Sequence, residues 1–228
     1  DLENVQLLPP VIQPPAVIHF ETDLGHARAV ANHILEDRVP LPRNWFEFPR
    51  YYFGGPYLVA GPEYQAQFVE GEEQFDYELH LAAVLGEPVC DASIEDAEDA
   101  ILGYMLMNVW VCRSQQSGYP GCLKGRSIAA PTGPWIVTKD EIPDPTALRF
   151  SAKINGTPIL EEETQRFRFT FPEMISFASE GVTIPEGTII TSGALRHCSG
   201  ITNEKYVKPG DEIDFTVDKI GTLKARVS

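Results

Sequence analysis

The sequence predicts an α+β fold in which short strands outnumber helices. Residues 75–86, FDYELHLAAVLG, alternate between the two sides of an extended chain, with the period of two that is typical of a strand. From residue 134 onwards, short segments with strand character are separated by turn residues. Helical spacing or a helix-start signal is confined to a few short segments. Many short strands with few helices are typical of an α+β domain.

The N-terminal part of the chain is expected to pass from an extended segment into a helix. Residues 1–16 contain four prolines, which exclude a helix and favour an extended path along the surface. Apolar residues at helical spacing predict a helix over 23–37, and Pro40 and Pro42 end it. The aromatic stretch 45–61 contains a Gly-Gly-Pro turn and predicts strand, turn and strand.

The segment 75–86 predicts a half-buried strand with one charged face. Tyr77 and Leu79 share one face, and Glu78 and His80 project from the other. Two interpretations remain open from these residues alone. Glu78 and His80 are either part of a metal or acid/base site or the solvated polar side of a strand.

The following segments continue the mixture of strands and short helices. Ser93 and the acidic residues after it predict a helix start, followed by a strand around 106–112. Residues 113–134 are rich in Gly, Ser and Pro and predict a long loop. One further short helix is expected at 171–181. The remaining strands are predicted at PWIVT, RFSAKING, RFRFTF, GTIIT, DEIDFTV and GTLKARV.

Composition and charge restrict the classes of partner. The chain of 228 residues is 43% hydrophobic and 22% charged, as in an ordinary globular protein, and its net charge is −15. This field repels nucleic acids and anionic membranes, and no apolar run is long enough to cross a bilayer. We expect a Pro-rich lead-in over 1–19 and one domain over 20–228.

The cysteines indicate reduced thiols in a cytoplasmic protein. No two of them have CxxC spacing, and no histidine pair lies beside them, which disfavours a zinc site and a disulfide framework. The four residues are Cys90, Cys112, Cys122 and Cys198.

Several motifs in order resemble the fumarylacetoacetate hydrolase superfamily, over roughly residues 20–228. Separated motifs in the correct order are far more specific than any one of them. They are WFEFPRYYFGGPYLVAGP, FDYELHLAAVLG, ILGYMLMNVWVCRSQQ, KGRSIAAPTGPWIVTKDEIPDP, FRFTFPEMISFASEGVTIPEGTIITSG and VKPGDEIDFTVDKIGTLKARV.

The resemblance implies a mixed β-sheet roll with a few short helices, a homodimer, and an active site at one mouth of the roll. It also implies a Mg²⁺ or Mn²⁺ ion on three carboxylates, which stabilises an enolate formed from a 1,3-dicarbonyl or 2-oxo acid. In the hydrolases of this family, a histidine–glutamate pair near the N-terminus activates water.

This chain departs from the family at the implied metal ligands. Of the Glu-x-Glu pair only Glu78 is retained, and His80 replaces the second glutamate. The implied metal aspartate is Val109, which cannot bind a cation. We therefore expect a protein that works without a metal. The alternative is Mg²⁺ or Mn²⁺ on a remodelled site that includes Glu78 and His80.

Other positions implied by the resemblance are also altered. The family's lysine loop offers Lys124, while Ser127 replaces an acidic residue, and Arg113 follows the second ligand segment. At the N-terminal histidine position the alignment places Asp23, with His26 or His33 as alternatives. Further residues expected to contact a substrate are Tyr51, Ala194, Arg196 and His197.

Together these residues predict an enzyme acting on an enolisable dicarbonyl or polyketide-like intermediate of a biosynthetic pathway. Glu78 and His80 would form an acid/base pair in which Glu78 raises the pKa of His80, and Lys124 would bind the oxyanion. The reaction would be an isomerisation, cyclisation, dehydration or C–C lyase step. A Mg²⁺- or Mn²⁺-dependent C–C hydrolase or 2-oxo acid decarboxylase and a non-catalytic ligand-binding member remain alternatives.

Overall fold

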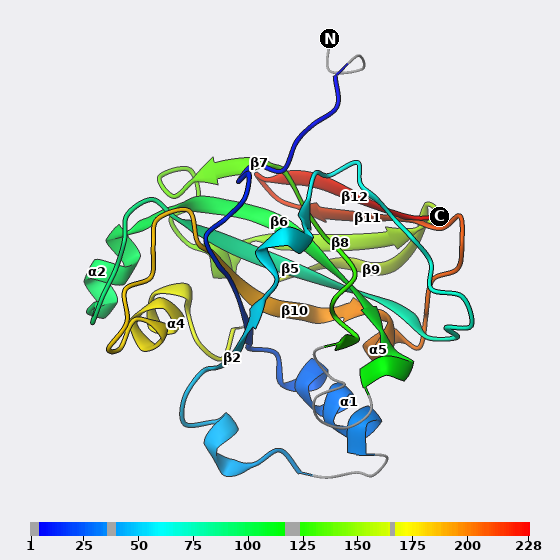
Figure 1. The fold of residues 1–228 in the computed structure, drawn as a ribbon, viewed down its shortest axis with the longest axis horizontal. Coiled ribbons are helices and arrows are strands. Elements are labelled where there is room, and N and C mark those ends of the chain that lie inside the picture. Colours follow the sequence, from blue (N-terminus) through cyan, green and yellow to red (C-terminus); the bar gives the residue numbers. More distant parts are fainter. Residues whose placement is uncertain (1–4, 36–39, 117–123, 165–166) are drawn as a thin grey trace.

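The computed structural model describes the chain except for residues 1–4, 36–39, 117–123 and 165–166. Its larger sheet has seven strands and both parallel and antiparallel pairs (Figure 1). β1 pairs in parallel with β10, and β3 with β7, whereas the other neighbours are antiparallel. In spatial order the strands are β2 (Arg50–Gly54), β1 (Val17–Glu21), β10 (Ile189–Ser199), β5 (Phe75–Leu85), β6 (Ile101–Cys112), β7 (Ala130–Thr138) and β3 (Val59–Ala60).

The second sheet has five strands and packs against one face of the first. β4 and β12 are parallel, and the remaining pairs are antiparallel. Its spatial order is β4 (Gln65–Ala66), β12 (Gly221–Val227), β11 (Glu212–Val217), β8 (Arg149–Ile154) and β9 (Thr157–Thr164).

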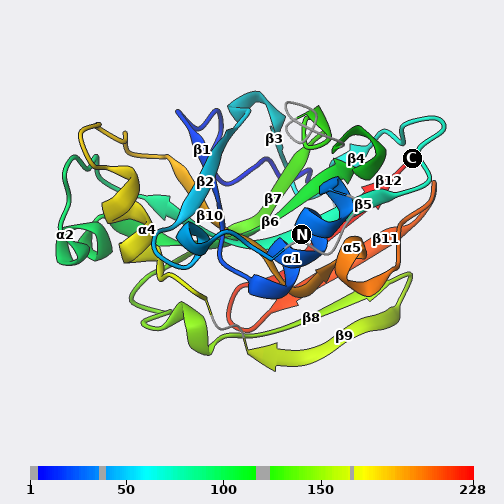
Figure 2. The ribbon, with the colours of Figure 1, turned by 90° about the horizontal axis from the view of Figure 1, so that it is seen from below.

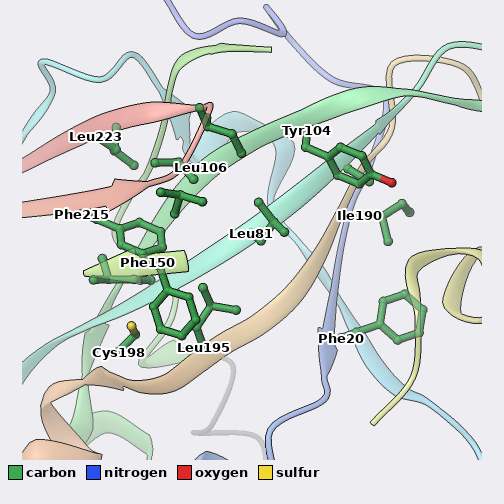
Figure 3. Close-up of a cluster of buried hydrophobic side chains, with 14 of the residues drawn as sticks. Phe20, Leu81, Tyr104, Leu106, Phe150, Ile190, Leu195, Cys198, Phe215 and Leu223 are labelled. Atoms are coloured by element: carbon green, nitrogen blue, oxygen red, sulfur yellow. The ribbon is translucent and has the colours of Figure 1, made fainter. Parts of the chain in front are cut away.

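The main hydrophobic core lies between the two sheets. Leu81 of β5 and Leu106 of β6 face Phe150 and Phe215 of the second sheet, and all four are buried (Figure 3). These side chains occupy every second position of their strands, which is why one face of each sheet contributes to the core.

The helices are short and lie around the sheets. α1 (Leu24–Leu35) and α5 (Gly200–Asn203) lie side by side next to β10, and α2 (Ile94–Asp99) packs against α4 (Phe171–Ala178) (Figures 1 and 2). Ser93 and Thr170 each form a capping box at the start of α2 and α4. Short 3₁₀ helices occur at Arg43–Trp45, Pro56–Leu58, Arg113–Gln116 and Pro145–Ala147.

The α+β class, the mixed sheets and the short helices are confirmed. Some elements differ from their prediction. The stretch 45–61 contains β2 and β3, but these strands pair with β1 and β7 and not with each other. The predicted loop 113–134 ends early, because β7 already begins at Ala130. The lead-in drawn over 1–19 includes the first residues of β1.

The prediction at RFRFTF is wrong over its described residues. Residues 167–170 form no strand, and Thr170 instead caps α4, which starts at Phe171. The neighbouring strand is β9 (Thr157–Thr164), whose segment TPILEEET lacks the alternation that was used to predict strands.

Two further sequence predictions concern cysteines and membranes. Cys90, Cys112 and Cys198 are free thiols, and Cys122 lies outside the described residues. Within the described ranges, no helix combines the length and apolar character needed to cross a bilayer.

Candidate functional site

The face of the larger sheet that points away from the second sheet carries a buried group of charged side chains. Asp76, Glu78 and His80 of β5 lie on this face, while Tyr77 and Leu79 point into the core between the sheets. Every residue of β5 is buried. The prediction of a half-buried strand is therefore wrong, because side chains from α1 and from the segments after β6 cover the charged face.

The carboxylate of Glu78 lies at the centre of this group and contacts four basic side chains. Its Oε1 lies 2.6 Å from Arg126 Nη2, 3.0 Å from Arg113 Nη2 and 3.3 Å from His26 Nε2. Its Oε2 lies 3.4 Å from Arg126 Nε and 3.5 Å from His80 Nε2. A carboxylate that is only 2% exposed is stable in its charged form because these groups compensate it.

Arg113 connects Glu78 to a second buried carboxylate. Its Nη2 lies 2.6 Å from Asp76 Oδ2, its Nε donates to the same oxygen at 2.7 Å, and its Nη1 donates to Gln116 at 2.6 Å. Asp76 also accepts hydrogen bonds from the backbone N–H groups of Gly200 and Ile201. Arg113 thus holds the two buried carboxylates together, and Asp76 also binds the start of α5.

Helix α1 supplies His26. Asp23 precedes this helix, and its side chain accepts a hydrogen bond from the N–H of His26 at 2.7 Å, as an N-cap does. His26 Nδ1 lies 3.0 Å from Ser199 Oγ, so both ring nitrogens have partners. His26 therefore reaches Glu78 from the N-terminal helix, whereas Asp23 fixes the start of that helix.

Thr191 lies between two further histidines. Its Oγ1 is 3.1 Å from His19 Nδ1 and 3.0 Å from His80 Nδ1. The imidazole of His19 stacks on Tyr52, with ring centroids 4.9 Å apart. The pairing of β1 with β2 places His19 directly opposite Tyr52 and explains this contact.

A cavity of about 270 Å³ adjoins this buried group. Arg126 lines the cavity and also binds Glu78, so its guanidinium connects the two regions. Glu78 and His80 are not among the described residues that line the cavity. The lining residues are Val17, His19, Tyr52, Phe53, Gly54, Gly55, Tyr57, Leu58, Val59, Val109, Arg126, Ser127 and Ala130.

The ion pairs determine the charge of Glu78 and Arg126. Burial acts to raise the pKa of Glu78, but the positive charges of Arg126 and Arg113 outweigh it and hold this pKa well below its usual range. Burial likewise acts to lower the pKa of Arg126, and Glu78 reverses that effect and raises it. The pair is therefore charged at neutral pH.

The two histidines beside Thr191 are neutral at neutral pH. Burial lowers the pKa of His19 well below its usual value, and the nearby His80 and Arg126 lower it further. Burial also lowers the pKa of His80, and Glu78 offsets this only in part. Glu78 does act to raise the pKa of His80, as expected, but the cost of burying the charged imidazole is larger, so this pKa is lowered overall.

The residues of this site do not fit a divalent metal ion. Mg²⁺ needs several hard oxygen ligands in octahedral geometry. Glu78 offers a carboxylate whose two oxygens already face arginine, and Val109, which pairs with Glu78 across β5 and β6, offers no ligand atom. Within the described part of the chain, no group of three or more His, Cys, Asp or Glu residues could hold a metal ion.

The structure brings together several of the residues expected at the site. Glu78, His80 and Arg113 belong to the buried group, and Val109 and Ser127 line the cavity. Ala194 pairs with His80 across β10 and β5. The roles assigned to these residues stay predictions.

Other expected residues lie elsewhere. Lys124 is exposed and is not among the described residues that line the cavity. Tyr51 lies on the opposite face of β2 from Tyr52 and packs against Phe20. The ring of His33 is hydrogen-bonded to the backbone oxygen of Arg113, and His33 is not among the described residues that line the cavity.

Arg196 and His197 are exposed on an irregular part of β10. Ala194 pairs with His80, and Ser199 pairs with Glu78. β10 therefore advances by five residues where β5 advances by two, and the extra residues form a bulge in β10. Within this bulge, His197 has a positive φ of 56°. Both side chains lie outside the described cavity lining.

Among the residues that line the cavity, Arg126, His19 and Tyr52 were not assigned a site role from the sequence. Arg126 stands two residues after Lys124 in KGRS, and only the course of this loop shows which basic residue turns inward. His19 was left unassigned, although it shares a strand face with the buried Val17. Tyr52 is one residue from Tyr51, and a shift of one residue changes the face of a strand.

The model of the family "Fumarylacetoacetate (FAA) hydrolase C-terminal" matches residues 21–228. The oxaloacetate tautomerase YisK of Bacillus subtilis (strain 168) is 32% identical over 188 residues, which are 79% of this chain and 62% of that protein. The 2,4-didehydro-3-deoxy-L-rhamnonate hydrolase of Sphingomonas sp. (strain SKA58) is 28% identical over 205 residues, which are 86% of this chain and 70% of that protein. The chain thus spans less than two thirds of the first of these relatives.

Solved structures share the fold. The 5-carboxymethyl-2-hydroxymuconate delta-isomerase from Mycobacterium smegmatis matches with a TM-score of 0.79 and 24% identity, over 99% of this chain and 83% of its own. The fumarylacetoacetate hydrolase from Exiguobacterium antarcticum matches with a TM-score of 0.77 and 24% identity, over 97% of this chain and 77% of its own. At these identities the likeness establishes the fold alone.

Proposed function

The chain belongs to the fumarylacetoacetate hydrolase family, and from this membership we propose that it is an enzyme that isomerises an enolisable 2-oxo acid or dicarbonyl, with Arg126 in place of a divalent metal ion. Isomerisation of such a molecule begins when a proton leaves the carbon next to a carbonyl group. The negative charge then develops on the carbonyl oxygen. A fixed positive charge beside this oxygen stabilises the enolate and lowers the barrier.

The single observation that carries the proposal is the double position of Arg126. Its guanidinium binds Glu78 at 2.6 Å, and Arg126 is also one of the residues that line the cavity. Glu78 thereby fixes the orientation of the guanidinium, and the planar group presents several N–H donors to a carboxylate or enolate oxygen. Ser127 lines the same cavity.

The relatives support this class of reaction. The names of two of them describe a tautomerase and an isomerase, and the name of a third describes a hydrolase. Cyclisation, dehydration and C–C cleavage can pass through the same enolate, and they remain finer alternatives within the proposal. A Mg²⁺- or Mn²⁺-dependent hydrolase or decarboxylase would need ligands that Glu78, His80 and Val109 do not supply.

The substrate is proposed to be a small anion. A cavity of about 270 Å³ suits a small molecule, and Arg126 is the charged residue in its described lining. The overall charge of −15 makes a local cation necessary for attracting an anionic substrate. We also propose that the protein forms a homodimer, as the resemblance implies. A non-catalytic ligand-binding role is the alternative to an enzyme.

The test follows the keto–enol conversion of oxaloacetate by ultraviolet absorbance, in buffer containing a chelator. We expect turnover by the wild type, a fall in kcat/KM of about 100-fold for R126A, and partial recovery for R126K. K124A is the matched variant, since Lys124 is exposed and only two residues away, and should change kcat/KM by less than about 2-fold. Activity that disappears with the chelator and returns with Mg²⁺ would contradict the proposal, as would an R126A variant with unchanged activity.

A further inference from the structure

Two buried histidines share one hydroxyl group. Thr191 Oγ1 lies 3.1 Å from His19 Nδ1 and 3.0 Å from His80 Nδ1, and Thr191 is fully buried. A hydroxyl has a single hydrogen, so it can donate to one of these nitrogens and must accept from the other. The protonation sites of the two imidazoles are therefore coupled through Thr191.

Glu78 sets the direction of this coupling. His80 Nε2 faces Glu78 Oε2 at 3.5 Å, too far for a well-formed hydrogen bond, and within the described part of the chain it has no hydrogen-bond partner. A nitrogen that faces a carboxylate is stabilised when it carries a hydrogen and destabilised when it presents a lone pair. His80 therefore carries its hydrogen on Nε2, and its Nδ1 accepts the hydrogen bond of Thr191.

His19 must then have the opposite arrangement. Because Thr191 donates to His80, it accepts from His19, which carries its hydrogen on Nδ1. The Nε2 of His19 is left with a lone pair. Through the successive contacts of Glu78, His80, Thr191 and His19, the buried charge of Glu78 thus determines which ring nitrogen of His19 carries the hydrogen.

The free nitrogen of His19 lies at the cavity wall. A Cβ atom added to Gly54 would come within 2.4 Å of His19 Nε2, so this edge of the ring is next to Gly54. His19, Gly54, Tyr52 and Arg126 all line the cavity. The stacked ring of Tyr52 holds the imidazole plane, and the missing side chain of Gly54 leaves room for Nε2.

We propose that His19 Nε2 takes the proton from the substrate carbon, and that Thr191, His80 and Glu78 are positioning residues that hold His19 in the required tautomer. This inference rests on the proposed function. The C–H bond breaks, an N–H bond forms on Nε2, and the electron pair moves to the carbonyl oxygen beside Arg126. The same N–H then returns the proton to this oxygen or to another carbon, and the enzyme recovers its starting state.

The first experiment needs no substrate and reads the tautomers directly. The chain has five histidines, whose ring nitrogens can be labelled with ¹⁵N and assigned by single substitutions. In the wild type we expect protonated Nδ1 and unprotonated Nε2 for His19, and the reverse for His80. In T191V the signal of His19 should change to a mixture of tautomers, whereas T191S should keep the wild-type pattern.

The second experiment measures kcat and KM separately with oxaloacetate. H19Q should lower kcat by about 100-fold with little change in KM, T191V should lower kcat by about 10-fold, and T191S should restore it. The matched control is T216V, which removes a hydroxyl that bonds Thr222 in the second sheet and should leave kcat unchanged.

The outcomes separate the two proposals. Wild-type protein without turnover overturns the proposed function. Turnover that survives in H19Q overturns the assignment of His19 alone. A His19 with hydrogen on Nε2 in the wild type, or a T191V variant that matches T216V in both tautomer and kcat, overturns the role of Thr191.

Discussion

On one face of β5, Tyr77 and Leu79 pack among apolar side chains between the two sheets, whereas on the other face Glu78 and His80 lie among arginines and histidines. Both faces are equally buried. The apolar face is stabilised by removal of surface from water, and the charged face is tolerated only because each charge has a partner. Burial by itself therefore does not distinguish a core from a site. The two faces differ in how much the free energy of unfolding falls when one side chain is removed.

The largest expected effect comes from breaking the charged face at Arg113. R113L leaves Asp76 and Glu78 without this buried partner and should lower the free energy of unfolding by about 3–5 kcal/mol, measured by urea denaturation. R149A removes an exposed pair with Asp218 and should cost less than about 1 kcal/mol. If R113L and R149A lost equal free energies of unfolding, the buried charges of this face would not depend on their partners.

A smaller effect is expected on the apolar face at Leu79. L79A should lower the free energy of unfolding by about 3 kcal/mol, because it removes a fully buried side chain and leaves a cavity. The kcat at a temperature well below Tm should stay within about 2-fold of the wild type, since Leu79 points away from Glu78. A large loss of kcat in folded L79A would show that the two faces are not independent.

The smallest effect is a pH dependence that belongs to the charged face. The pKa values of His19 and His80 are lowered in the folded state, so below their ordinary value of 6.5 the unfolded chain binds protons that the folded chain does not. The free energy of unfolding should therefore fall with decreasing pH, by about 1 kcal/mol per pH unit for each histidine. In H19Q this slope should be shallower. A slope that is unchanged in H19Q, or of opposite sign, would contradict the assignment.

Local patterns in the sequence predicted much of the fold. The alternation in β5, β11 and β12 and the helix-start signal at Ser93 act over a few residues, and these elements are found where they were expected. β9 was missed because its segment TPILEEET has no clear alternation, and its place depends on pairing with β8.

The candidate site was predicted less completely, for a physical reason. Glu78 and His80 were placed on one face by the period of two, which is a local property. The partners of these residues come from distant parts of the chain: Arg126 lies 48 residues from Glu78, and Thr191 lies 111 residues from His80. No pattern in a short window contains such contacts. The choice of Arg126 over Lys124 depends on the path of a loop.

The strand that carries the buried charges and the lining of the cavity differ in how far their backbone can open. β5 is hydrogen-bonded to β10 on one side and to β6 on the other, so its amides are expected to exchange with solvent only when the whole domain unfolds. The cavity lining includes residues of the 3₁₀ helix Pro56–Leu58 and of the two-residue strand β3, and Tyr57 is 83% exposed. We therefore expect this part of the lining to adapt to differently shaped ligands, while β5 keeps the charges in place.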